Sequence, residues 1–289
     1  MKQIAINGHV IGQGHPCYII AEIGVNHNGC LKTALELVDA AKEAGADAVK
    51  LQTWNTEAIC STASKQYWPL KLLELSQGSF NVIRAHAKKR KIDFFTTPDD
   101  RASVDFVTGN LPTPGSCLVQ ALKIGSGGLD PELIRYVGML AKQEKIPVIM
   151  STGMCDWPKV RRSVDVLAET GCKFALMHCV SAYPAKIEDM NLAMIRKLET
   201  FGVPVGLSDH SRFGGAGSVA VYAGAKLIEA HITLDPMDTE GPDHHMSMGP
   251  STFSQYVEAI RHADQIMGTG KKQVLECERG TMKILKERK

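Results

Sequence analysis

The stretch KLIEAHITLDPMDTEGPDHHMSMGP, residues 226–250, indicates how this chain is built. It begins with a short, mainly apolar run that is typical of a buried strand and that ends on His231. A loop rich in acids, glycines, prolines and histidines follows at once, over residues 235–245. Proteins made of parallel strands and helices present their chemistry in the loops that follow buried strands. The stretch therefore predicts a strand that delivers a histidine to a polar edge, and other strands should end in the same way.

The same alternation of strand and helix repeats eight times from Tyr18 onward. Strands are expected at residues 18–23, 46–53, 92–96, 121–125, 147–151, 174–179, 203–207 and 226–233. Helices are expected at residues 31–44, from about 71 through 90, at 101–108, from 130, at 158–170 and 191–200, from 214, and at 251–267. Eight such units in about 250 residues are typical of a (β/α)8 TIM barrel, an α/β fold. A doubly wound open sheet is the alternative, but it would not usually need eight units, and the first turn has no G-x-G-x-x-G.

Three segments stand outside this rhythm. Residues 1–17 alternate apolar and polar around Asn7-Gly8 and predict an N-terminal β-hairpin ahead of a catalytic barrel at 18–270. Residues 54–70 form a less regular section within the second unit. Residues 271–289 form a charged tail or linker remnant, expected to be a short helix or disordered.

Composition argues against several classes of protein. The 289 residues carry a formal net charge of +2 without a long basic run, which argues against nucleic-acid binding. Eight scattered cysteines without a C-x-x-C pair indicate reduced thiols. The first residues do not show the pattern of a signal peptide, so none is expected, and no apolar run approaches the roughly 18 residues of a membrane span. We expect a cytoplasmic protein that binds no membrane.

In a closed barrel the ends of all eight strands meet at one mouth, and here those ends are polar. The side chains expected at the mouth are Glu22, Lys50, Gln52, Thr97, Lys123, Ser126, Ser151, Thr152, His178, Ser181, Tyr183, Ser208, Asp209, His210 and His231. Few of these would be chosen to fill a hydrophobic barrel. The mouth is therefore the candidate active site.

Lys50 and Lys123 predict a site for a phosphate or a carboxylate. Lysine supplies a point charge, and Ser126, Ser151 and Ser208 supply directed hydroxyl donors. In KIGSGG (123–128) and MSTGM (150–154) a hydroxyl, that of Ser126 and of Thr152, lies next to a glycine, where the backbone can approach an anion closely. An ion pair with a neighbouring acid would explain either lysine alone equally well, but the combination favours an anion site.

His210 and His231 occupy corresponding positions on adjacent strands. Two imidazoles at a polar mouth, with Glu22 and Asp243 within reach, could bind one divalent metal ion and leave positions open. Two satisfied hydrogen-bonding histidines are the alternative, and the residues alone leave both open. A nucleophilic role for Cys179 is rejected, because its neighbour His178 points to the opposite face of the strand.

Nine segments, taken in order, carry a specific resemblance. They are AEIGVNHNG (21–29), DAVKLQT (47–53), TTPDD (96–100), LKIGSG (122–127), MSTGM (150–154), HCVSAYPA (178–185), GLSDHS (206–211), IEAHITLD (228–235) and EGPDHHMS (240–247). Each is a weak motif alone. Together they span about residues 19–267, and the chain resembles the N-acetylneuraminate (sialic acid) synthase family.

The resemblance implies a barrel enzyme that condenses phosphoenolpyruvate with an N-acylated aminosugar aldehyde, giving a nine-carbon 2-keto acid and phosphate. It implies a divalent cation, Mn²⁺ or Mg²⁺, on His210 and His231. It assigns catalysis to Glu22, Lys50 and Lys123. The implied contacts to phosphoenolpyruvate are the two lysines with Thr97, Ser126, Ser151 and Ser208. The implied contacts to the sugar are Glu22, Gln52, Tyr183 and Asp243, with Ser181 in the same substrate pocket.

The chain departs from the family pattern in three places. Gly128 replaces the acid of an S-G-E motif, and Ser181 replaces the asparagine of N-x-Y. The resemblance covers only the barrel, and full-length members carry an additional antifreeze-like domain. Three explanations stay open: a separately encoded domain acts as a partner, the sequence is part of a longer protein, or residues 54–70 close the site instead. A homodimer is expected as well.

Two further functions stay open at this point. A related 3-deoxy-ulosonate synthase would act on a phosphorylated sugar and would want a cation at the mouth, for which Arg212 is available. A non-catalytic sugar-binding barrel is the other reading, although such a protein has no need of Lys50 and Lys123.

Overall fold

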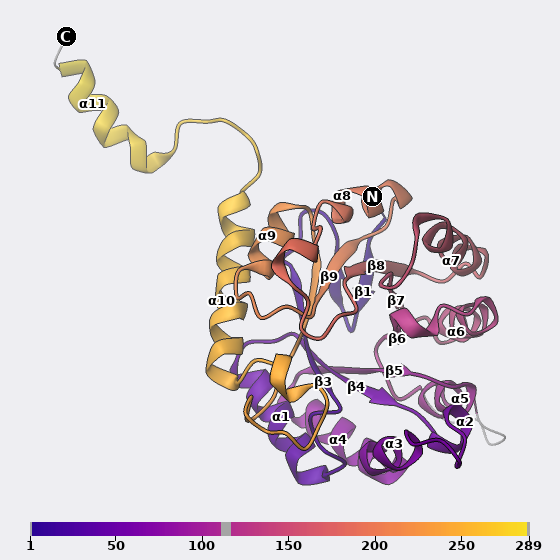
Figure 1. The fold of residues 1–289 in the computed structure, drawn as a ribbon. Helices are drawn as coiled ribbons and strands as arrows, with labels where there is room; N and C mark the ends of the chain where they lie inside the picture. Colours follow the sequence, from indigo (N-terminus) through magenta and orange to yellow (C-terminus); the bar gives the residue numbers. More distant parts are fainter. Residues whose placement is uncertain (1, 111–116, 288–289) are drawn as a thin grey trace.

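The computed structural model describes residues 2–110 and 117–287, and its centre is a closed barrel of eight parallel strands. Neighbouring strands follow the order β10-β3-β4-β5-β6-β7-β8-β9, with helices arranged around the outside (Figure 1). The (β/α)8 prediction is confirmed. The strands are β3 (Tyr18–Gly24), β4 (Ala48–Thr53), β5 (Asp93–Pro98), β6 (Leu122–Ile124), β7 (Val148–Ser151), β8 (Phe174–Cys179), β9 (Val205–Asp209) and β10 (Leu227–His231).

The barrel strands are almost completely buried, because side chains on one face fill the barrel and those on the other pack against helices. Strand pairing then fixes which strand ends are neighbours. Glu22 of β3 lies opposite His231 of β10 on one side and Lys50 of β4 on the other. The register thus brings residues far apart in sequence to one edge.

Helices follow the strands, and several begin at the acids that predict them. Asp100, Asp130 and Asp156 each accept a hydrogen bond from the backbone N–H three residues on, which caps the helix that follows. The helices are α1 (Leu31–Glu43), α2 (Thr56–Ile59), α3 (Tyr67–Leu73), α4 (Gln77–Arg90), α5 (Arg101–Thr108), α6 (Pro131–Glu144), α7 (Trp157–Glu169), α8 (Met194–Leu198), α9 (Ala216–Tyr222), α10 (Pro250–Met267) and α11 (Arg279–Glu287).

The N-terminal hairpin, β1 (Ile4–Ile6) and β2 (His9–Ile11), is fastened to the end of the barrel opposite the mouth. Asp93, the first residue of β5, accepts hydrogen bonds from Asn7 Nδ2 at 2.7 Å and from the Tyr18 hydroxyl at 2.7 Å. His9 Nδ1 lies 2.9 Å from the same carboxylate. The hairpin therefore covers the amino ends of the strands and leaves the carboxyl ends open.

The structure differs from the sequence-based expectation in two local elements. The section 54–70 contains α2 and the start of α3, and the helix expected at 191–200 is shortened to α8 and a 3-10 turn at Glu199–Phe201. Both are short pieces whose apolar periodicity is too brief to read. At the other end, α11 extends away from the barrel (Figure 1) and buries none of its described side chains.

Candidate active site

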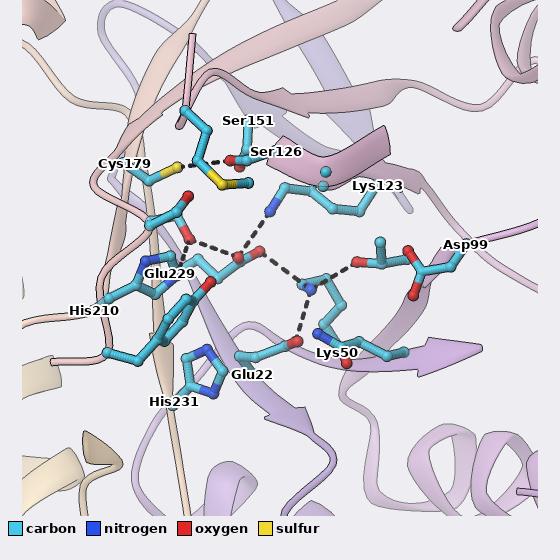
Figure 2. Close-up of a pocket in the computed structure, with 18 residues that line it drawn as sticks. Glu22, Lys50, Asp99, Lys123, Ser126, Ser151, Cys179, His210, Glu229 and His231 are labelled. Atoms are coloured by element: carbon cyan, nitrogen blue, oxygen red, sulfur yellow. Dashed lines mark hydrogen bonds and ion pairs between the residues drawn. The ribbon is translucent and has the colours of Figure 1, made fainter. Parts of the chain in front are cut away.

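A cavity of about 230 Å³ opens at the carboxyl ends of the barrel strands (Figure 2). Twelve of the thirteen side chains that the family resemblance assigns to the site line it. They are Glu22, Lys50, Gln52, Thr97, Lys123, Ser126, Ser151, Ser181, Tyr183, Ser208, His210 and His231. The thirteenth, Asp243, lies beside His231, with 3.7 Å between Asp243 Oδ2 and His231 Nδ1.

The floor of the cavity is a buried network of two lysines and two glutamates. Lys50 Nζ lies 2.8 Å from Glu22 Oε2 and 3.8 Å from Glu229 Oε2. Lys123 Nζ lies 2.8 Å from Glu229 Oε1. All four side chains are at most 4% exposed. Because the charges alternate, each lysine is held in place by a carboxylate.

Glu229 is the residue of this floor that the sequence analysis missed. It accepts from Lys123 and from the Ser208 hydroxyl, at 2.8 Å each. The run 226–230 is mainly apolar, so the sequence pattern indicates a buried strand and does not by itself mark Glu229 as a site residue. Strand periodicity could have found it, because Glu229 precedes His231 by two residues and must face the same side.

The two glutamates differ in charge because their neighbours differ. Burial raises the pKa of Glu22 to about 7, with Glu229 adding to the rise and Lys50 opposing it. Burial also raises the pKa of Glu229, but Lys123 and Lys50 together lower it further, so the net pKa lies far below its ordinary range. Glu229 is therefore ionised, while Glu22 can gain or lose a proton near neutral pH.

The two histidines lie together at the edge of this floor, with 5.6 Å between ring centroids. His210 Nδ1 donates to the Val180 carbonyl oxygen at 2.9 Å, which leaves Nε2 as the acceptor nitrogen, 3.3 Å from the Ser208 hydroxyl. His231 Nδ1 is buried and has no hydrogen-bond partner among the described residues. Burial lowers the pKa of both imidazoles, so both are neutral at pH 7.

Buried hydroxyls also line the cavity. Ser151 Oγ and Ser181 Oγ have no hydrogen-bond partner within the described chain, although neither atom reaches solvent. Ser126 Oγ accepts from the Gly153 N–H at 3.0 Å and lies 3.1 Å from Cys179 Sγ. Because buried polar groups are usually satisfied, the two free hydroxyls are ready to bind a ligand.

Several polar residues near the mouth do not reach the cavity. His27 is completely buried, and its Nδ1 accepts from the Gly29 N–H at 3.0 Å. His178 bonds to the Met190 carbonyl oxygen, on the other side of β8 from Cys179. The Arg212 guanidinium donates to the His245 carbonyl oxygen and does not line the cavity. The cation that a phosphorylated sugar would want is therefore not supplied by Arg212.

Comparison with known proteins gives one consistent result. A model of the NeuB family matches residues 37–272. The chain is 38% identical to the N,N'-diacetyllegionaminic acid synthase of Legionella pneumophila, across 90% of this chain and 76% of that protein. It is 32% identical to the human N-acetylneuraminate-9-phosphate synthase, across 94% of this chain and 77% of that protein.

A solved structure shows the same similarity at the level of the fold. The N-acetylneuraminic acid synthetase of Leptospira borgpetersenii superimposes with a TM-score of 0.87 at 30% identity, covering 98% of this chain and 96% of that one. The similarity therefore extends over the barrel and the hairpin together.

Proposed function

The chain belongs to the NeuB family, and from this we propose that it condenses phosphoenolpyruvate with the aldehyde of an N-acylated aminosugar. The products are a nine-carbon 2-keto acid of the sialic acid type and phosphate. The observation that carries the proposal is the lining of the cavity, which combines Lys50 and Lys123 with the hydroxyls of Ser151 and Ser181, unpartnered among the described residues. Fixed positive charges and free donors suit the phosphate and carboxylate of phosphoenolpyruvate.

The lysines stabilise the charge that develops as phosphate leaves. Because Glu22 and Glu229 already hold both ammonium groups in place, little reorganisation is needed when the substrate binds. The methylene carbon of phosphoenolpyruvate attacks the aldehyde carbon, whose oxygen takes a proton and becomes a hydroxyl. Water then adds to carbon 2, and the bond from carbon 2 to the phosphate oxygen breaks to give the keto group.

Glu22 is the group that we assign to proton transfer in this sequence. Its carboxylate lines the cavity beside Lys50, and its pKa of about 7 allows both protonation states at working pH. As a base it accepts the proton that the attacking water loses. Glu229 is held ionised by two lysines and is not suited to that step.

The residues also fit a divalent metal ion, although no group of three His, Cys, Asp or Glu side chains in residues 2–110 and 117–287 is arranged to hold one. His210 directs the lone pair of Nε2 toward the cavity, 3.3 Å from the Ser208 hydroxyl, and fixes its ring through a backbone carbonyl, as metal-binding histidines usually do. The buried His231 Nδ1 has no hydrogen-bond partner among the described residues. These two imidazoles would hold Mn²⁺ or Mg²⁺, and the ion would polarise the aldehyde carbonyl as a Lewis acid.

The test measures phosphate released from phosphoenolpyruvate with a panel of acceptors in the presence of Mn²⁺ or Mg²⁺. The panel contains N-acetylmannosamine, its 6-phosphate, a 2,4-diacetamido hexose and arabinose 5-phosphate. We expect release with an N-acyl sugar and none with arabinose 5-phosphate. No release with any N-acyl sugar would overturn the proposal in favour of a sugar-binding barrel, and turnover of arabinose 5-phosphate alone would favour the 3-deoxy-ulosonate reading.

The metal assignment is tested separately. His231→Ala should abolish metal-dependent turnover and keep the circular dichroism spectrum of the native fold. His262→Ala, on the exposed face of α10, is the matched control and should retain full activity. If the His231→Ala protein keeps its turnover, the histidine pair does not hold the ion.

We further expect the protein to lie in the cytoplasm, to form a homodimer, and to work with a separate partner that carries the antifreeze-like domain. In the described residues no helix is both long and apolar enough to cross a membrane. Light scattering of the purified chain gives the subunit number, and adding a separately expressed antifreeze-like domain to the phosphate-release assay tests the partner.

A further inference from the structure

The cavity has a second level above its floor, and Asp99 lies there. Gln52 follows Lys50 by two residues, and Asp99 follows Thr97 by two, so each faces the cavity one step nearer to solvent. The Asp99 backbone N–H donates to the Thr53 carbonyl oxygen at 2.9 Å, which continues the strand ladder past the end of β5. Figure 2 shows Asp99 at the side of the cavity beyond Lys50.

The Asp99 carboxylate has no partner of its own. Within the part of the chain that the structure describes, it accepts no hydrogen bond and lies in no ion pair, whereas the neighbouring Asp100 caps α5 and also accepts from the Asn55 N–H. The Asp99 side chain is exposed at the mouth, yet the cavity walls dehydrate its carboxylate and raise its pKa to about 6, with Asp100 adding to the rise and Lys50 opposing it. The group is therefore ionised at pH 8.

Among the described residues, no unpaired cation balances the charge of Asp99 at the upper level. Lys50 and Lys123 are the only lysine or arginine side chains among the described residues that line the cavity, and each is paired with a glutamate at 2.8 Å. Neutral groups of the same lining include the amide of Gln52 and the hydroxyl of Ser181. This level suits a ligand rich in hydroxyl and N–H donors, and it opposes a second negative charge.

We propose that Asp99 selects an uncharged N-acyl sugar over the phosphorylated form of the same sugar. Its carboxylate accepts a hydrogen bond from a sugar hydroxyl or amide N–H and repels a sugar phosphate. The inference rests on the proposed function and names the class of acceptor. The relatives leave this choice open, because one is named for a legionaminic acid and another for a 9-phosphate product.

The test compares kcat/KM for N-acetylmannosamine and for N-acetylmannosamine 6-phosphate at pH 8 with saturating phosphoenolpyruvate. We expect the wild-type enzyme to prefer the neutral sugar. Asp99→Asn keeps the shape and removes the charge, so kcat/KM for the neutral sugar should fall by about tenfold, since a hydrogen bond to a charged acceptor is lost. The ratio of the two kcat/KM values should shift toward the phosphorylated sugar, and KM for phosphoenolpyruvate should stay the same.

Asp165→Asn is the control, because it removes an exposed acid on α7 without touching the cavity. It should leave the ratio unchanged. The inference is overturned if the wild type uses the 6-phosphate as well as the neutral sugar, or if Asp99→Asn alters both acceptors equally.

Failure of the proposed function is distinguishable from failure of this inference. If neither sugar releases phosphate, calorimetric titration of both sugars into protein saturated with phosphoenolpyruvate replaces the kinetic ratio. Preferential binding of the neutral sugar that weakens in Asp99→Asn supports the inference, and equal binding of the two sugars overturns it.

Discussion

His27 is a buried base that lies outside the cavity, and its environment links stability to pH. The imidazole has no exposed surface, and burial lowers its pKa from 6.5 to about 4. The folded protein thus binds a proton less readily than the unfolded chain does. The contribution of the neutral His27 side chain to the free energy of unfolding is fully present above pH 6.5 and is lost as the pH falls toward 4.

We predict that acid destabilises the wild-type protein more than a His27→Gln variant. Between pH 7 and pH 5 the histidine should account for a loss of about 2 kcal/mol in the free energy of unfolding. Urea unfolding at both pH values measures the difference, and the exposed His262→Gln serves as the control. If His27→Gln shows the same loss between the two pH values as the wild type, another group is responsible.

At the scale of the elements, the contact between β9 and β10 positions the floor of the cavity. Gly206 pairs with Leu227 and Ser208 pairs with Glu229, so a shift at the first pair moves the second. A Cβ atom on Gly206 would lie 2.3 Å from the Leu227 carbonyl oxygen. Only glycine allows the two strands this close approach.

Gly206→Ala should therefore force β9 and β10 apart. We expect the free energy of unfolding to fall by about 3 kcal/mol or more, since the clash is with backbone and not with a flexible side chain. Gly214→Ala is the matched control, because a Cβ at that position meets no atom of the described residues within 4 Å. Urea unfolding followed by circular dichroism compares the two, and equal stability would show that the strands adjust freely.

At the scale of the whole molecule, the hairpin and the barrel share one hydrophobic core. Ile4, Ile6 and Ile11 of the hairpin are buried in the same cluster as the barrel residues. The hairpin therefore contributes to the stability of the barrel from the end opposite the cavity.

We predict that Ile6→Ala destabilises the whole protein by about 2–5 kcal/mol and that it unfolds in a single transition. Removing residues 276–289 is the contrasting change, and the unfolding free energy should stay the same because α11 buries none of its described side chains. Denaturant unfolding of both variants measures the unfolding free energy and the number of transitions. A separate early transition in Ile6→Ala would mean that the hairpin is an independent unit.

The amino-acid sequence by itself determined the architecture and most of the cavity lining. Apolar runs of strand length, each followed by a helical period and a cap such as Asp130, are local signals, and eight of them specify a barrel. Because the strand ends of a barrel must meet, the sequence alone is enough to place Lys50, Lys123, His210 and His231 together at one mouth.

Only the tertiary structure decided which of these groups are paired and which are free. Glu229 pairs with Lys123 although the two residues are 106 positions apart in the sequence, and no local sequence pattern predicts that contact. Asp99 and Asp100 are adjacent in sequence, yet Asp100 caps a helix and Asp99 faces the cavity without a partner among the described residues. Periodicity tells which face a side chain occupies, whereas its charge state and its partner depend on distances between strands that only the closed barrel sets.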